Sequence, residues 1–183
     1  MNKYVLGFFF LMVVQLNAQN RDKVWMLGFY ANQNMGISFD NGSVDTFSLI
    51  RDLGFFITNA SICDTAGNLL FYTNGQLLYN RFHQPMLNSS NFNPGTATFD
   101  PGLYPYGLNI EQGVLVLPHP DSSNLYDLFH ISSEYFPAYN VNQAQPLNLM
   151  HTVIDMNLDS GKGGITSIKN EVIISDTLSH GGL

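Results

Sequence analysis

The chain has few charged residues, and those of positive sign are scarce. Charged side chains make up 11% of its 183 residues, against roughly a quarter in an average soluble domain. Seven basic and fourteen acidic residues give a net charge of −7, and the basic residues form no cluster. Nucleic acids and anionic membrane surfaces are recognised by such clusters. The composition therefore argues against both classes of partner.

Cysteine is almost absent as well. Cys63 is the only one, so no disulfide forms within the chain. It lies in an apolar, strand-like run next to Asp64, whereas basic neighbours are what activate a thiol. We interpret Cys63 as a small buried hydrophobic residue. The hydrophobic content of 45% is sufficient for a packed core and argues against disorder.

Residues 1–18 have the three parts of a cleavable export signal. Lys3 supplies the positive charge, Val5 to Val14 form an unbroken apolar run, and a short polar stretch ends at Ala18. Ten residues of helix are only about 15 Å long, half the hydrocarbon thickness of a bilayer, so we expect cleavage and no membrane span afterwards. The sequence predicts a mature protein that begins at Gln19, passes through the periplasm, and is secreted or held at the cell surface.

Helical periodicity is also nearly absent, and short β-prone runs alternate with turn signals. Asn74-Gly75 is a two-residue hairpin signal. Strands up to residue 80 are expected to form one antiparallel meander, with residues 86–109 and 132–148 as long loops. The predicted strands are 25–30, 36–40, 55–63, 68–73, 76–80, 114–117, 149–156 and 165–175.

Two of these runs, 69–72 and 114–117, are apolar on both alternating faces. Such strands are expected in sheets that are covered on both sides, as the blades of a propeller are. A weak repeat agrees, because Asp64…Asn68-Leu69 recurs as Asp121…Asn124-Leu125 at an offset of 56 residues. We predict an all-β fold of antiparallel meanders, with about two propeller-like blades of an incomplete propeller over residues 19–183. A β-sandwich is the alternative.

Seven segments, taken in order, resemble one family. The block 67–75, Gly-Asn-Leu-Leu-Phe-Tyr-Thr-Asn-Gly, is the most specific of them. Over roughly residues 25–183 the chain resembles the N-terminal propeller-like region of large secreted proteins from bacteria that use type IX secretion. The seven segments are 59–64, 67–75, 79–81, 86–88, 117–120, 153–156 and 169–170.

The resemblance implies a structural or adhesive role and supplies no catalytic residues. In that family, further blades and a C-terminal sorting domain follow the region matched here. The resemblance therefore implies that the partners of this chain include its own C-terminal blades, which the sequence lacks.

No motif of a serine-hydrolase elbow, a zinc protease or a phosphate-binding loop occurs. The histidines share no metal-ligand spacing; they are His83, His119, His130, His151 and His180. We predict a non-catalytic secreted or cell-surface protein with a binding or structural, adhesion-type role. The alternative is a secreted hydrolase on a propeller scaffold, which a pocket with convergent Asp and His side chains would favour.

One short motif resembles the opening of a calcium loop. Asp155, Asn157 and Asp159 alternate with other residues, and Ca²⁺ prefers several such oxygen ligands. Gly161 is one position late, however, and Thr166 stands where a bidentate Glu closes a calcium loop. Two interpretations stay open: an ordinary turn, or a weak calcium site in a protein that otherwise has no cofactor.

Aromatic residues in the two long loops are the other candidate site. Loop aromatics suit the recognition of a surface glycan or a protein. The alternative is that these rings fill gaps between blades. The candidates are Tyr104 and Tyr106, with Phe99, in the first loop and Tyr135 and Phe136, with Tyr139, in the second.

Overall fold

The computed structural model describes residues 20–29, 35–40, 42–102, 104–135, 144–176 and 178. The strands in these ranges pair only in antiparallel fashion, which confirms the predicted all-β class. The elements are β1 (Val24–Leu27), β2 (Met35–Asp40), β3 (Ser43–Ser48), β4 (Ala60–Cys63), β5 (Leu69–Thr73), β6 (Leu78–Asn80), β7 (Val114–Pro118), β8 (Leu125–Tyr135), β9 (Ala144–Asp155), α1 (Leu158–Gly161), β10 (Gly164–Ile165) and β11 (Glu171–Ser175).

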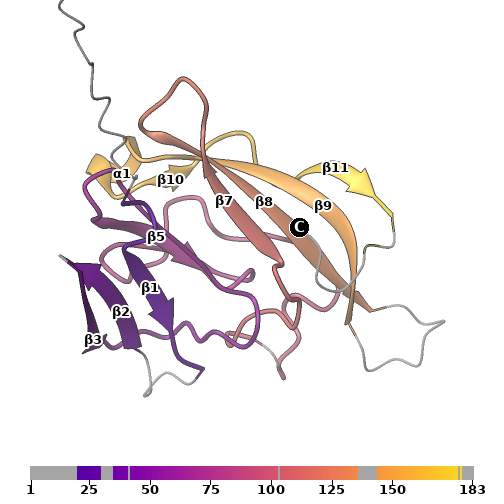
Figure 1. The fold of residues 1–183 in the computed structure, drawn as a ribbon. Helices are drawn as coiled ribbons and strands as arrows, with labels where there is room; N and C mark the ends of the chain where they lie inside the picture. The colour runs from indigo at the N-terminus through magenta and orange to yellow at the C-terminus, as the bar shows by residue number, and fades with distance from the viewer. Residues whose placement is uncertain are drawn as a thin grey trace, which may run out of the picture.

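The strands form three sheets, which lie one after another across the molecule (Figure 1). The first sheet is β1-β2-β3, the second is β4-β5-β6, and the third is β10-β9-β8-β7, with β11 also paired to β9. The prediction of one meander up to residue 80 is therefore wrong. The amide of Phe55 bonds to the carbonyl of Gly28 and that of Thr58 to Leu108. These bonds hold the chain between β3 and β4 as a loop, so the predicted strand 55–63 shortens to β4.

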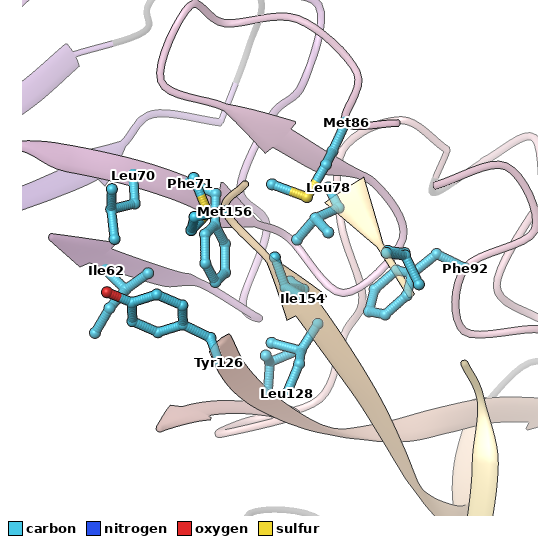
Figure 2. Packing of buried hydrophobic residues seen from close by; sticks show 12 residues of the cluster. Ile62, Leu70, Phe71, Leu78, Met86, Phe92, Tyr126, Leu128, Ile154 and Met156 are labelled. Atoms are coloured by element: carbon cyan, nitrogen blue, oxygen red, sulfur yellow. The ribbon is translucent and has the colours of Figure 1, made fainter. Parts of the chain in front are cut away.

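The largest apolar cluster lies between the second and third sheets. Figure 2 shows its side chains pointing toward one another from both sheets. Phe71 of β5 meets Tyr126 of β8 edge to face, with ring centroids 5.6 Å apart. The cluster consists of Ile62, Leu70, Phe71, Leu78, Met86, Phe92, Val114, Tyr126, Leu128, Ile154, Met156 and Ile165. Packing of facing sheets through such a cluster positions the third sheet on the second.

A second cluster lies between the first and second sheets and contains Met26, Leu53, Phe55, Tyr72 and Tyr79. β5 therefore has one covered face toward each neighbouring sheet, as predicted for residues 69–72. A β-bulge at Leu70 sets this arrangement, because Cys63 pairs with Leu69 and Ile62 with Phe71. The extra residue lets Leu70 and Phe71 both join the larger cluster while Tyr72 joins the smaller one.

The same prediction is wrong for residues 114–117. In β7, Val114 is buried in the larger cluster, but Leu115 and Leu117 are 41% and 43% exposed. Only one face of the third sheet packs on the second sheet. No other sheet among the described residues covers the opposite face at β7.

The hairpin between β5 and β6 is longer than the two residues predicted. β5 ends at Thr73, which pairs with Leu78, so residues 74–77 form a four-residue turn. The side chain of Asn74 shapes the turn, since its Oδ1 accepts from the amides of Gln76 and Leu77. Its Nδ2 donates to the carbonyls of Gly54 and Pro105 and ties the turn to two loops.

The long loop predicted at 86–109 is confirmed: its described residues, 86–102 and 104–109, contain no strand, and Met86, Phe92 and Leu108 are buried. The loop predicted at 132–148 is wrong at both ends, because β8 continues to Tyr135 and β9 begins at Ala144. The predicted strand 165–175 is split into β10 and β11. Both copies of the proposed repeat lie at matching places, since Leu69 opens β5 and Leu125 opens β8.

Candidate binding surfaces

The outer face of the third sheet carries both apolar and titratable side chains. The register of β7, β8 and β9 places Leu115, Phe129 and His151 in one row across the sheet. Leu117 and Asp127 are partners in the adjacent row. We call the face formed by Leu115, Leu117, His119, Asp127, Phe129 and His151 the outer face.

Asp127 lies at the centre of this face and binds two histidines. Its Oδ2 is 2.9 Å from Nδ1 of His119, and its Oδ1 is 2.8 Å from Nε2 of His151. The Asp127 side chain is only 12% exposed, that of His151 21% and that of His119 41%. The ring of His151 stacks on Phe129, with centroids 5.1 Å apart. Both carboxylate oxygens are thus satisfied, and both imidazoles are held in place.

The sequence did not indicate this cluster. The three residues lie on β8, on β9 and just after β7, and only the pairing register brings them together. Because His119 binds Asp127 through Nδ1, its Nε2 is left for another partner, the arrangement in which an Asp–His pair acts as a base. In the described ranges, no Ser, Thr or Cys side chain hydrogen-bonds either imidazole. Nor do these ranges contain a group of three or more His, Cys, Asp or Glu side chains arranged to hold a metal ion.

Two of the predicted ligand-binding tyrosines lie together. The ring of Tyr104 is 5.7 Å from that of Phe99, and both are more than two fifths exposed. The hydroxyl of Tyr135 donates to Oδ2 of Asp100 at 2.7 Å, and the amide of Tyr104 donates to the Asp100 carbonyl. The Tyr135 hydrogen bond, with that of the Gly102 amide, lowers the pKa of the Asp100 carboxyl. Phe99, Asp100, Tyr104 and Tyr135 therefore form one aromatic and acidic surface.

Tyr106 is separate from this surface. Its ring packs against Phe29, which in turn contacts Phe56, with centroid distances of 5.6 and 5.3 Å. The Tyr106 ring is therefore packed against other loop aromatics, and the alternative that such rings fill gaps between blades stays a prediction. Two further candidates, Phe136 and Tyr139, lie outside the described residues.

The predicted calcium ligands lie at the end of β9, which Asp155 closes, and in the turn that follows it. Oδ1 of Asp155 accepts a hydrogen bond from the amide of Asn157, and Oδ2 of Asp159 is 3.2 Å from the ammonium of Lys162. Asp159 and Ser160 have φ of 49° and 55°, so α1 is an irregular turn. The two carboxylates thus have partners that ordinary turn chemistry supplies. Calcium binding here stays a prediction.

Within the described part of the chain, no helix combines the length and apolarity that crossing a bilayer requires. Comparison of the sequence and the fold with protein-family models, with curated proteins and with solved structures finds no match.

Proposed function

We propose that the chain is a non-catalytic, secreted or cell-surface protein with a binding or structural, adhesion-type role, built from propeller-like stacked sheets. The observation that supports this proposal best is the outer face of the third sheet. Leu115 and Leu117 are exposed there beside a carboxylate whose hydrogen bonds are already satisfied. A surface of this kind suits the docking of another protein surface more than it suits chemistry.

The internal repeat supports the same proposal. When Asn68 is aligned with Asn124, Phe71 corresponds to Asp127 and Tyr72 to Leu128. Tyr72 packs toward the first sheet and Leu128 toward the second, so these two faces are equivalent. Phe71 packs on the third sheet. The repeat therefore supports the proposal that another sheet likewise covers the outer face around Asp127.

We therefore propose that a further sheet of the same kind covers the outer face. In the family that the sequence resembles, that sheet is a further blade of the same protein. Each sheet of such a stack is stabilised chiefly by its neighbours. Burial of apolar surface at about 25 cal/mol per Å² drives the contact. Docking leaves Asp127 bound to two imidazoles, so no unsatisfied carboxylate is buried.

Dye binding and oligomeric state test this proposal. We expect the purified mature chain, residues 19–183, to bind a hydrophobic dye and to self-associate in light scattering. The double variant Leu115→Lys, Leu117→Lys should bind several-fold less dye. Ile50→Lys is the matched control, since Ile50 is 90% exposed and lies outside the three sheets. A monomeric wild-type chain that binds no dye and melts sharply would contradict the proposed docking face.

Export is tested separately. The proposal expects mature protein outside the cell that begins at Gln19. N-terminal sequencing of material from the medium and from the cell surface measures this. Material that retains Met1 would show that the signal is not cleaved.

The secreted hydrolase remains the second candidate, and the His119–Asp127 pair is the observation that favours it. If His119 were a general base for ester hydrolysis, His119→Gln and Asp127→Asn would each lower activity toward p-nitrophenyl esters. His83→Gln is the control, because His83 lies away from the outer face and binds Tyr72. Equal rates in all four proteins would remove the hydrolase alternative.

A further inference from the structure

The first and second sheets are joined along β1 and β4 in an unusual way. Ser61 Oγ donates to the carbonyl of Val24 at 2.9 Å, and Asn59 Nδ2 donates to that of Met26 at 2.6 Å. The side chains of Ser61, in β4, and Asn59, just before it, thus join β4 to β1, next to a backbone hydrogen bond from the Cys63 amide to the Arg21 carbonyl. We call this junction the seam. An open hollow of about 350 Å³ lies along it, lined by Trp25, Leu27, Asn59, Ala60 and Ser61.

Trp25 borders this hollow and a second one. The second hollow has a volume of about 380 Å³ and is lined by Asn20, Asp22, Lys23, Trp25 and Phe39. Trp25 is the only tryptophan in the chain. Its side chain meets Phe39 edge to face at 5.1 Å, yet the residue is 49% exposed. The indole is therefore held by a neighbouring ring while much of its surface is free for contact.

Polar groups surround the indole at one end. The Lys23 ammonium is fixed by Asp40 at 2.7 Å, and Asp22 and Asn20 line the same hollow. The Asp22 carboxylate can accept hydrogen bonds and the Lys23 ammonium can donate them; Nδ2 of Asn20 donates to the Thr65 carbonyl at 3.3 Å, so Asn20 can offer its Oδ1 as an acceptor. Volumes near 350 Å³ lie at the lower end of small-ligand sites. A flat aromatic surface with acceptors and donors at its edge matches a ligand that has an apolar face and a hydroxylated rim.

A pyranose ring has this character, and a hexose whose hydroxyls are all equatorial has two apolar C–H faces. We propose that Trp25 is the platform of a glycan site, with one sugar ring stacked on the indole and its hydroxyls bound by Asp22 and Asn20. The ligand class is a β-linked glucan-type chain. This proposal rests on the proposed binding function. It places the glycan at Trp25, whereas the sequence pattern predicted a glycan or protein ligand at the loop aromatics.

Because Trp25 is the sole tryptophan, its fluorescence reports on this site directly. We expect titration of the full chain with cellohexaose to produce a saturable change in tryptophan emission. Asp22→Asn should weaken binding about tenfold, the loss expected for one charge-assisted hydrogen bond. Asp22 is exposed, so this change leaves the fold intact, and an unchanged thermal melt verifies that. Phe82→Leu is the control, since Phe82 is an exposed aromatic elsewhere and its loss should leave affinity unchanged.

Calorimetry separates the possible results. Binding that is lost in Trp25→Leu supports the proposal. Binding that survives Trp25→Leu but is lost in Tyr104→Leu would overturn it and place the glycan on the loop aromatics. Absence of any saturable signal with cellohexaose would also overturn it. The proposed docking at the outer face is tested separately, by dye binding and self-association.

Discussion

Arg51 joins three parts of the molecule through one buried guanidinium. The residue is 3% exposed, and its Nε and Nη2 donate to the carbonyls of Leu53 and Leu27. The guanidinium also lies over the ring of Phe55, 4.5 Å from its centroid. Burial raises the pKa of the Tyr72 hydroxyl although the Arg51 charge opposes that shift. Removing the cation therefore leaves buried carbonyls unsatisfied, which costs more than the contacts themselves are worth.

We expect Arg51→Met to lower the free energy of unfolding by about 2–4 kcal/mol, because it keeps the volume but removes the donors. Urea denaturation followed by circular dichroism measures this. Arg81→Met is the matched control, since Arg81 is exposed over the ring of Phe82 and should change stability by less than about 0.5 kcal/mol. Equal effects in the two variants would contradict the role given to Arg51.

His130 predicts a pH dependence of stability. Burial, with a smaller effect of His151, lowers its pKa to about 3, and Nε2 is 3.0 Å from Thr152 Oγ1. The unfolded chain takes up the proton near pH 6.5 while the folded protein does not. Above pH 6.5, His130 is neutral in both states and does not reduce the free energy of unfolding. As the pH falls from 6.5 toward 3, His130 lowers the free energy of unfolding by up to about 1.4 kcal/mol per pH unit.

The measurement is the free energy of unfolding at several pH values for wild type and His130→Phe. The aromatic ring keeps the contact with Phe92, whose centroid is 4.5 Å away. We expect the wild type to lose stability faster than the variant between pH 6.5 and 4. Parallel curves would show that His130 does not titrate on unfolding.

At the level of elements, local chemistry made the presence of a hairpin between β5 and β6 predictable, though its turn has four residues and not two, whereas distant contacts set the sheet boundaries. Asn74 and Gly75 form the turn with neighbours in sequence, so their signal is complete in a short window. The loop before β4 depends on Leu108, some fifty residues away, which no window contains. His119 and His151 share no sequence spacing with Asp127 because strand register alone unites them.

Two glycines have similar backbone φ angles but different surroundings. Replacing each with alanine therefore separates the cost of backbone strain from the cost of crowding around the added Cβ. Gly75 and Gly42 have φ of 83° and 80°. A Cβ at Gly75 would lie 2.9 Å from Leu108 Cδ1 and 3.0 Å from Thr58 Cγ2, while one at Gly42 meets nothing within 4 Å. We expect Gly42→Ala to cost about 1 kcal/mol from backbone strain alone. Gly75→Ala should lower the free energy of unfolding by about 1–2 kcal/mol more. Chemical denaturation of both variants measures the difference. Equal costs would show that the contacts with Leu108 and Thr58 do not destabilise the Gly75 variant.

At the scale of the whole molecule, stability is concentrated in the contact between the second and third sheets. Phe71 is fully buried there, so Phe71→Ala should cost about 3–5 kcal/mol. Phe47, on β3, is 36% exposed and covers Gly36, so Phe47→Ala should cost clearly less. Thermal and urea unfolding compare the two, and a larger loss in Phe47→Ala would reverse this ranking.

The seam between β1 and β4 also determines how the molecule yields to a pulling force. Within the strands of the first sheet, only Met26 and Gly36 are buried. The hydrogen bonds from β4 and the residue before it to the first sheet's segment are two side-chain bonds, from Asn59 and Ser61, and one backbone bond, from Cys63 to Arg21. Few cooperative contacts thus oppose detachment of this sheet. Tension applied through the N-terminal end should peel the first sheet away while the larger cluster holds. Hydrogen exchange tests this without an applied force. We expect the backbone amides of β2 and β3 to exchange before those of β8 and β9. Simultaneous exchange would mean that the three sheets open as one unit.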